Sequence, residues 1–460
     1  MTRPFLAVGI VLALSFGFFS GIPLAGRNIG MIGALAAALF GAVGCIANRV
    51  NTVRADRNVR YVTLPYLLLI VTPCLLAAAG AFIRGDADAA QLLTELAETF
   101  FYWAILEVSV RFAWEDERPV RFVLSLTCLA MIGNLAYWII SGVPIRFEGL
   151  ASHRNVIGGA GLYIGLLALV LDMVPWRRSQ IYQWLLYGTF LLAVSAIISC
   201  GSRTSAICLS AATGLRLILP ALRLPPAGLL PLPLAVIAFV FVAPFLYLRL
   251  DEFFFFDDLN QAFEDVSGNG VYSGRETKWG DVISASAERP FIGHGYQWKI
   301  HFSEKSMHAH NLYLGKLFQS GALGLFGLFL FSLHLVRLVL RTRMPEASLV
   351  ISFLLLHQCF TINFTMGGIP VGCAQAVMLG ALIRMATDSR LMMSARESVS
   401  RDLTEMSGRP DGVPDDDYFT EAGSADAGVG GGSRVPGDDR IRLSEDRSRS
   451  LATSEGDERP

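Results

Sequence analysis

Apolar residues dominate the chain in about twelve long blocks, which short polar segments separate. A helix that crosses a membrane needs roughly 20 mainly apolar residues. The blocks have about that length, so the pattern predicts an all-α bundle of about twelve transmembrane helices. They fall near 5–22, 29–47, 61–83, 91–112, 122–142, 155–174, 184–201, 204–219, 228–248, 311–336, 348–366 and 369–387.

Two of these blocks need separate interpretation. The first, 5–22, has no convincing small-x-small cleavage site after it, and further apolar blocks follow, so we expect an uncleaved span rather than a signal peptide. The fourth, 91–112, carries several charges, and charge at membrane depth is costly. That block either packs inside the bundle or does not cross the membrane. Its charged residues are Glu95, Glu98, Glu107 and Arg111.

Basic residues indicate the orientation of the chain. Lys and Arg in short connections are held on the cytoplasmic side. Here they follow even-numbered blocks, which places both termini in the cytoplasm and the hydrophilic stretch 249–310, with four of the seven histidines, on the outer face. The basic residues that set this parity are Arg49, Arg54, Arg57, Arg60, Arg118, Arg121, Arg177, Arg178, Arg337, Arg341 and Arg343.

Composition agrees with a membrane protein. Hydrophobic residues make up 53% of the chain and charged residues 17%, and the mean hydropathy is +0.48, whereas soluble chains are about 25% charged. We therefore expect a transmembrane domain over 1–387 and a disordered cytoplasmic tail over 388–460. From Asp402 onward the tail has fifteen acidic and seven basic side chains and almost no aromatic residues. Basic residues elsewhere stand singly, which excludes a nucleic-acid-binding surface.

The cysteines give no sign of a disulfide framework or a zinc site. None of the seven lies at CxxC spacing, and nearly all fall inside apolar blocks. We interpret them as small apolar residues of the core. They are Cys45, Cys74, Cys128, Cys200, Cys208, Cys359 and Cys373.

The first candidate site is the polar segment 199–205 on the predicted outer side. It separates two blocks that are together too long for one span. Gly201 permits a tight reversal, after which Thr204 or Ser205 can cap the next helix. The free N–H groups of that helix start, beside the guanidinium of Arg203, can bind an anion. The alternative is an arginine side chain that extends to a lipid headgroup.

The second candidate is the segment 273–296. Apolar spacing between Arg275 and Ala287 suits a short amphipathic helix that lies against the bundle. Near the start of that helix, Arg275 can bind a phosphate through two parallel hydrogen bonds. The alternative is an ion pair with Glu276 or Asp281 on a solvated surface. The sequence then predicts a helix stop and a turn with close backbone approach, from Pro290, Gly293 and Gly295.

The third candidate is the segment 308–314, where the outer loop joins the tenth block. A neutral imidazole at a helix start, held by a partner such as Asn311, can accept a hydroxyl proton near neutral pH. His308 and His310 also have a spacing that metal sites use, but no nearby carboxylate or cysteine completes a ligand set. Interfacial polarity without a chemical role is the third interpretation.

Taken in order, these motifs resemble the O-antigen ligase and O-antigen polymerase superfamily. The resemblance covers roughly residues 120–385, and the span count and the long outer loop agree with it. The matching motifs are Arg154-Asn155, Ser202-Arg203-Thr204, Gly274-Arg275 with Trp279, Pro290 with Gly293 and Gly295, and Ala309-His310-Asn311 followed by Leu312, Tyr313, Leu314, Gly321 and Gly324.

The resemblance implies a glycosyltransferase of the GT-C type in the bacterial inner membrane, with its active site facing the periplasm. Its donor would be a glycan on undecaprenyl pyrophosphate, and it would need no metal ion, cofactor or nucleotide sugar. Arg203 and Arg275 would hold the pyrophosphate and stabilise it as the leaving group, and His310 would activate or position the acceptor hydroxyl. The expected substrate-binding residues are Arg203, Arg275, Trp279, His308 and Asn311.

The acceptor distinguishes two interpretations within that superfamily. A ligase transfers a finished glycan to a lipid A core sugar, whereas a polymerase joins the repeat units of a polysaccharide. The compact loop between Arg275 and His310 and the motif at Ala309 favour the ligase. A third interpretation is a transporter that moves a lipid-linked glycan without bond chemistry. Its charged residues should line a path at mid-depth, whereas here most candidates lie at one face.

Overall fold

A computed structural model describes most of the region before residue 386. The chain divides into two compact units, Met1–Ser398 and Val399–Pro460. The predicted tail, 388–460, lies outside the described residues. The described residues are 3–20, 22–24, 27–28, 35–40, 43, 64–85, 89–144, 147, 149–151, 154–172, 179–222, 231–249, 252–253, 255–267, 275–295, 300–302, 305–307, 311–340, 345–359 and 371–385.

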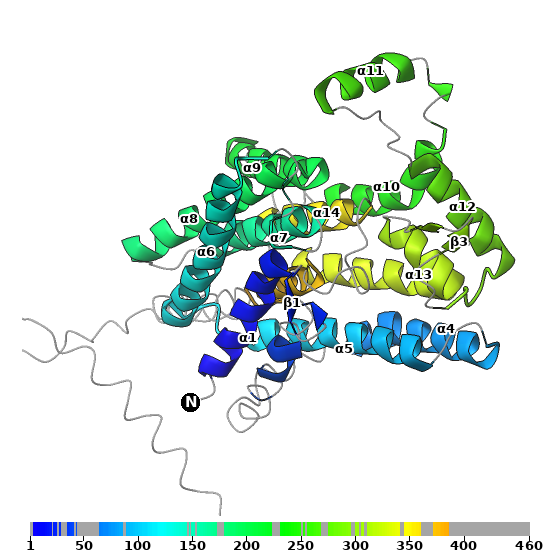
Figure 1. The fold of residues 1–460 in the computed structure, drawn as a ribbon, viewed down its shortest axis with the longest axis horizontal. Coiled ribbons are helices and arrows are strands. Elements are labelled where there is room, and N and C mark those ends of the chain that lie inside the picture. The colour runs from blue at the N-terminus through cyan, green and yellow to red at the C-terminus, as the bar shows by residue number, and fades with distance from the viewer. Residues whose placement is uncertain are drawn as a thin grey trace, which may run out of the picture. The chain divides into compact units, whose positions relative to one another are not determined.

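The described part is predominantly helical, as the apolar blocks predict (Figure 1). Two short antiparallel hairpins, which the sequence did not indicate, join β1 (Pro23–Leu24) to β2 (Arg27–Asn28) and β3 (Ile300–Phe302) to β4 (Lys305–Met307). The helices of the N-terminal half are α1 (Arg3–Ser15), η1 (Phe16–Phe19), η2 (Leu67–Val71), α4 (Thr72–Ile83), α5 (Ala89–Arg111), α6 (Glu117–Ile140) and α7 (Arg154–Asp172). Those of the C-terminal half are α8 (Gln180–Cys200), α9 (Arg203–Leu222), α10 (Pro231–Tyr247), α11 (Phe256–Ser267), α12 (Arg275–Glu288), α13 (Leu312–Leu340), α14 (Pro345–Gln358) and the helix Val371–Met385.

Five of the described helices are long and apolar enough to cross a membrane. Each predicted block contains helix, although little of 29–47 is described. The class of helical membrane protein is therefore confirmed, and the count of twelve spans stays a prediction. The five helices are Leu64–Ile83, Glu117–Ile140, Asn155–Asp172, Gln180–Cys200 and Leu312–Val339, and shorter apolar helices are Pro4–Phe19, Pro231–Tyr247, Ala347–Gln358 and Val371–Met385.

The charged fourth block forms one continuous helix, α5. Nε and Nη2 of Arg111 donate hydrogen bonds to Oε1 of Glu107 at 3.0 and 2.6 Å. Both side chains are mostly buried, at 14% and 12% exposure. A buried charge is tolerated when it is paired, so this pairing accounts for two of the four charges in the block. The side chains of Glu95 and Glu98 lie outside the described residues.

Helix α7 is the most deeply buried of the five long helices, because 83% of its 18-residue apolar stretch lies inside the protein. It packs against α8, α9 and α14. Gly161 and Gly165 make this close packing possible, because a Cβ on either would lie 3.0 Å from the Ala193 carbonyl oxygen or the Leu209 side chain. Small residues three or four positions apart allow close helix contacts in membranes. The first turns of α7 therefore lie beside the end of α8 and the start of α9.

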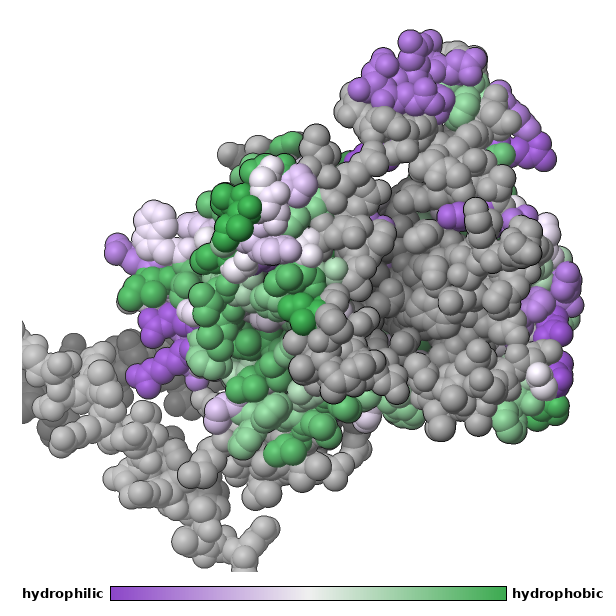
Figure 2. All heavy atoms as spheres, in the orientation of Figure 1, coloured by the Kyte–Doolittle hydropathy of each residue, from purple (hydrophilic) through white to green (hydrophobic). Residues whose placement is uncertain are grey.

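The predicted outer loop contains two helices. Helix α12 begins at Arg275 and ends at Glu288, just before Pro290, which confirms the predicted amphipathic helix and its stop. Helix α11, which the sequence analysis missed, carries two acidic residues in its first turn, and hydrophilic residues cover it in Figure 2, where apolar residues cover much of the α6 and α8 side. The β3–β4 hairpin belongs to the same stretch.

Helix α13 is broken at Gly321, whose φ of 63° and ψ of −161° are non-helical. Such a conformation is essentially restricted to glycine. The ring of Phe241 on α10 lies 5.2 Å from that of Tyr313 and 5.4 Å from that of Phe329, centroid to centroid. In a straight helix Tyr313 and Phe329 would lie about 24 Å apart along the axis. The two halves of α13 therefore meet at a sharp bend.

The segment after α12 supplies the backbone partners that this break removes. The N–H groups of His294 and Gly295 donate to the carbonyls of Phe318 and Gln319 at 2.9 Å, and Ala322 N–H donates to the Pro290 carbonyl at 2.7 Å. Non-helical backbone at membrane depth requires such internal pairing. Gly293 and Gly295 have positive φ, 68° and 82°, so the predicted turn with close backbone approach is confirmed.

Candidate functional site

The turn between α8 and α9 presents the first candidate residue, Arg203. Gly201 adopts the left-handed conformation, with φ of 64°. Its N–H donates to the Ile198 carbonyl at 3.1 Å, and the N–H of Ser202 donates to that of Ile197 at 3.3 Å. These two bonds form a Schellman motif, which ends α8 sharply. The predicted reversal is confirmed, and exposed Arg203 is the first residue of α9.

The hydroxyl groups beside Arg203 do not cap α9 as predicted. Thr204 and Ser205 lie inside its first turn, because the helix already begins at Arg203. Ser202 precedes the helix, and its Oγ donates to Oγ of Ser205 at 2.9 Å. The side chain of Ser205 is buried. The turn is thus connected to the protein interior through side-chain hydroxyls.

A buried histidine continues that connection. Nε2 of His357, on α14, lies 3.3 Å from Oγ of Ser205. Its Nδ1 lies 2.9 Å from the hydroxyl of Tyr163 on α7, and the two rings meet edge to face at 5.5 Å. His357 and Tyr163 are 1% and 0% exposed. A polar chain therefore runs from the Arg203 turn to the centre of the bundle.

The start of α7 also lies against this turn. Gly158 faces Ser202 so closely that a Cβ on Gly158 would collide with the Ser202 side chain. The N–H of Phe147 donates to the Ser199 carbonyl at 3.1 Å, which joins the preceding segment to the end of α8. Asn155, in the first turn of α7, is exposed. The motif at 154–155 is thereby placed at the same end of the bundle as Arg203.

The start of α13 is fixed by Asn311. Its Oδ1 accepts hydrogen bonds from the N–H groups of Tyr313 and Leu314 at 2.9 and 3.1 Å, which is the bonding of a helix N-cap. Asn311 is fully buried, and its Nδ2 has no hydrogen-bond partner among the described residues. The side chain that we expected to contact substrate thus uses Oδ1 to cap α13, while the hydrogens on Nδ2 can still be donated to another group.

Helix α14 joins the starts of α9 and α13. The hydroxyl of Tyr313 donates to the Leu355 carbonyl at 3.3 Å, and His357, two residues further on, contacts Ser205. The next side chain, Gln358, is fully buried, and neither polar atom of its amide is paired within the described part of the chain. The first turns of α9 and α13 therefore meet the same end of α14.

Helix α12 packs along the first half of α13. Trp279 is 0% exposed and belongs to a buried cluster with Val282, Ala285, Leu314 and Phe318. Its ring also lies 4.6 Å from that of Tyr247, at the end of α10. These contacts pack α12 against α13 and α10. A contact with substrate, which we expected of Trp279, stays a prediction.

This packing sets the direction of α12. The ring of His294, just after α12, stacks on Phe318 at 4.7 Å, and its Nε2 lies 2.7 Å from the Ala285 carbonyl oxygen. The C-terminal end of α12 is therefore beside the break in α13. Helix α12 also contacts Leu314, near the start of α13. Arg275, the first residue of α12, therefore lies toward the start of α13. The side chain of Arg275 is outside the described residues.

The predicted site residues can now be located. Arg203 and Arg275 are the first residues of α9 and α12, and Asn311 directly precedes α13. The starts of α9 and α13 contact the same end of α14. His308 and His310 lie outside the described residues, directly before Asn311 in the sequence. The sequence analysis did not single out His357 or Tyr163. A signal for His357 was present, because an ionisable residue inside an apolar block is a functional candidate by default.

The cysteines are placed as predicted where they are described. Six of them are buried and not in disulfide bonds, and Cys45 lies outside the described residues.

In a comparison with known families, residues 188–332 match the family model described as O-antigen ligase. That segment contains Arg203, Arg275 and His310 but neither Tyr163 nor His357. No curated protein matches the chain.

Proposed function

We propose that this chain, which belongs to the O-antigen ligase and O-antigen polymerase superfamily, transfers a glycan from undecaprenyl pyrophosphate to an acceptor hydroxyl at the periplasmic face of the inner membrane. Of the two activities we propose the ligase, with a lipid A core sugar as acceptor. The compact loop from Arg275 to His310 is the sequence feature behind that choice.

One observation supports a shared site. The first turns of α9 and α13, which are more than a hundred residues apart in sequence, contact α14 at positions two residues apart. α12 adds its own start through packing against α13. Two arginine-bearing helix starts therefore lie toward the start of α13, which His310 precedes in the sequence. Helix starts carry free N–H groups and partial positive charge, which favours a pyrophosphate.

In the proposed reaction, the acceptor oxygen attacks the anomeric carbon of the donor glycan. The bond from that carbon to the pyrophosphate oxygen breaks, and undecaprenyl pyrophosphate leaves. His310 takes the proton of the acceptor hydroxyl. Arg203 and Arg275 stabilise the negative charge that grows on the leaving group, which is worth most in a site partly shielded from water.

The test is rescue of a deletion strain by single variants. We expect wild-type protein to restore long glycans on the lipid A core, and Arg203→Ala, Arg275→Ala and His310→Ala to restore little, with losses of about 100-fold or more. Arg249→Ala is the matched control, because Arg249 also belongs to the outer loop region and forms an exposed ion pair with Glu252. The readouts are lipopolysaccharide gels and the undecaprenyl-linked pool, at matched protein levels.

The outcomes separate the alternatives. In the deletion strain, long glycans that accumulate on undecaprenyl pyrophosphate while the lipid A core stays bare identify a ligase. Single repeat units in place of long chains identify a polymerase. In an enzyme, His310→Ala also leaves donor binding largely intact. Equal loss of binding and transfer, or loss of neither, would reject the role of His310, and equal rescue by all variants would reject the proposed site.

A further inference from the structure

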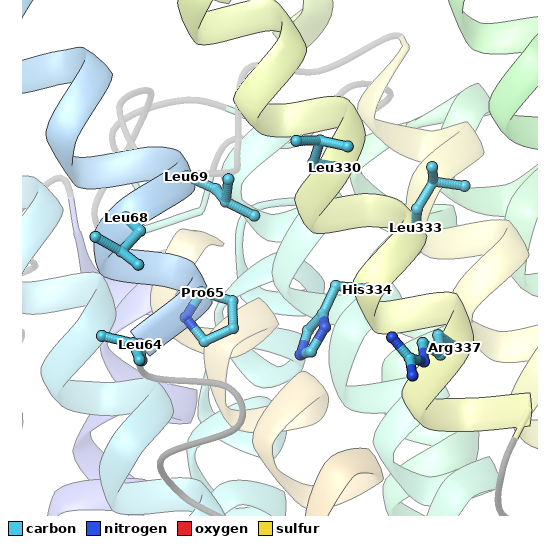
Figure 3. Close-up of a pocket in the computed structure, with 8 residues that line it drawn as sticks. All are labelled: Leu64, Pro65, Leu68, Leu69, Leu330, Leu333, His334 and Arg337. Carbon is cyan, nitrogen blue, oxygen red and sulfur yellow. The ribbon is translucent and has the colours of Figure 1, made fainter.

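A groove separates α13 from the first residues of the apolar helix Leu64–Ile83, which comprises η2 and α4 (Figure 3). Further along, the helices touch, because Gly327 lies so close to the Leu69 carbonyl that a Cβ would collide with it. Toward Arg337 they part and leave a cavity of about 420 Å³. Its walls are mainly leucine side chains from both helices, namely Leu64, Leu68, Leu69, Leu330 and Leu333.

One end of this groove is basic. His334 and Arg337 line it from the last turns of α13, and Figure 3 shows both side chains on the side of α13 that faces the segment of Leu64 and Pro65. No acidic residue is among its lining residues in the described part of the chain. In the sequence, Arg57 and Arg60 precede Leu64, and Arg341 and Arg343 follow Arg337.

The groove opens toward the surface that membrane-spanning helices present to lipid. Leu64 and Leu68 are 56% and 58% exposed, which is high for leucine in water but normal against acyl chains. The basic connections place this end of the bundle at the cytoplasmic leaflet. Basic pockets between transmembrane helices on that side are known to bind anionic lipid headgroups.

We propose that this groove binds an anionic glycerophospholipid of the cytoplasmic leaflet. One acyl chain lies along the leucines between α13 and the segment 64–69, and the phosphate is bound by Arg337 and His334. The guanidinium can donate two hydrogen bonds to phosphate oxygens. A zwitterionic lipid offers the same oxygens, but its cationic ammonium group is repelled by the basic end of the groove. The isoprenoid tail of the proposed glycan donor fits less well, because its only phosphates belong at the opposite face.

The test uses the full chain in detergent, titrated with phosphatidylglycerol or phosphatidylcholine and analysed by native mass spectrometry. We expect wild-type protein to retain one phosphatidylglycerol in preference to phosphatidylcholine. In Arg337→Gln that preference should fall about fivefold. Arg384→Gln is the matched control, because Arg384 also ends a helix but pairs with Glu115 at 3.2 Å and does not line the groove. High salt should weaken retention by wild type more than by Arg337→Gln.

A second variant keeps the proposal testable if Arg337→Gln does not fold. Leu68→Trp fills the groove from its exposed side while Arg337 stays in place, and we expect it to lose the bound phospholipid. Equal retention by wild type and Leu68→Trp, or by wild type and a folded Arg337→Gln, would overturn the proposal. So would a polyprenyl phosphate, rather than a phospholipid, extracted from the purified protein.

Discussion

Ser205 and His357 are 152 residues apart in sequence, yet Oγ of the first lies 3.3 Å from Nε2 of the second. The serine belongs to the first turn of α9, two residues after Arg203, and the histidine to the last turn of α14. On its other nitrogen His357 contacts Tyr163 of α7. The imidazole therefore connects three helices at the level of the candidate site, and we assign it a positioning role for the turn that carries Arg203.

Replacement of His357 should reduce transfer through that turn. His357→Ala leaves the buried hydroxyls of Ser205 and Tyr163 without their shared partner, at about 1–3 kcal/mol each. A glutamine places a polar atom near the position of Nε2 and an asparagine near that of Nδ1. We therefore expect His357→Gln, which can still contact Ser205, to retain more activity than His357→Asn.

The measurement is the rate of glycan transfer in membranes, with kcat and KM determined separately. Loss of positioning should lower kcat more than it raises KM, because Arg203 is proposed to act on the leaving group. Tyr163→Phe is the control, since it breaks only the bond on the far side of the ring. If all four variants lost activity in proportion to their loss of thermal stability, the role of His357 would be structural alone.

Gly158 tests the contact between α7 and the Arg203 turn. In Gly158→Ala the added Cβ collides with the Ser202 side chain, so the turn must shift. We expect at least a tenfold loss of transfer and a destabilisation of about 1–3 kcal/mol. Gly188→Ala, on α8, is matched to it because nothing lies within 4 Å of its added Cβ. If Gly158→Ala rescued transfer to the wild-type level, the position of the turn would not limit the reaction.

Gly321 tests the break in α13. Gly321→Ala must adopt a φ of 63° and places its Cβ against the backbone of Phe291. Each effect costs on the order of 1–3 kcal/mol, so we expect much lower thermal stability and little folded protein in the membrane. The partner variant Gly315→Ala, in the same helix but with open space around its Cβ, should match wild type in both measurements. Equal melting temperatures for the two variants would contradict the bend.

Asn311 tests whether its free amide serves the substrate. Asn311→Ser keeps an oxygen that can cap α13, whereas Asn311→Ala loses it, at about 1 kcal/mol. If Nδ2 donates to the substrate or to His310, Asn311→Ser should keep near-normal thermal stability and still lose most transfer activity. Activity that follows stability in both variants would limit Asn311 to capping.

Several parts of the fold follow from the sequence because they depend on local physics. Apolar blocks of bilayer length predicted where the described apolar helices lie. Gly201 predicted the reversal before Arg203, and Pro290 predicted the end of α12, because each effect arises within a few residues of backbone. The cap at Thr204 or Ser205 was predicted wrongly, because several neighbouring hydroxyls could start the helix and the choice among them depends on what each side chain contacts.

The tertiary structure alone decided which helix starts meet. Nothing near Arg203 in the sequence indicates His357, because their connection passes through α9, α14 and α7, and side-chain hydrogen bonds between distant helices leave no local pattern. The break at Gly321 was likewise hidden, since glycine is compatible with a straight helix and becomes a bend only when the segment after α12 supplies backbone partners. The sequence determined the residue types and the helices, and packing determined their convergence.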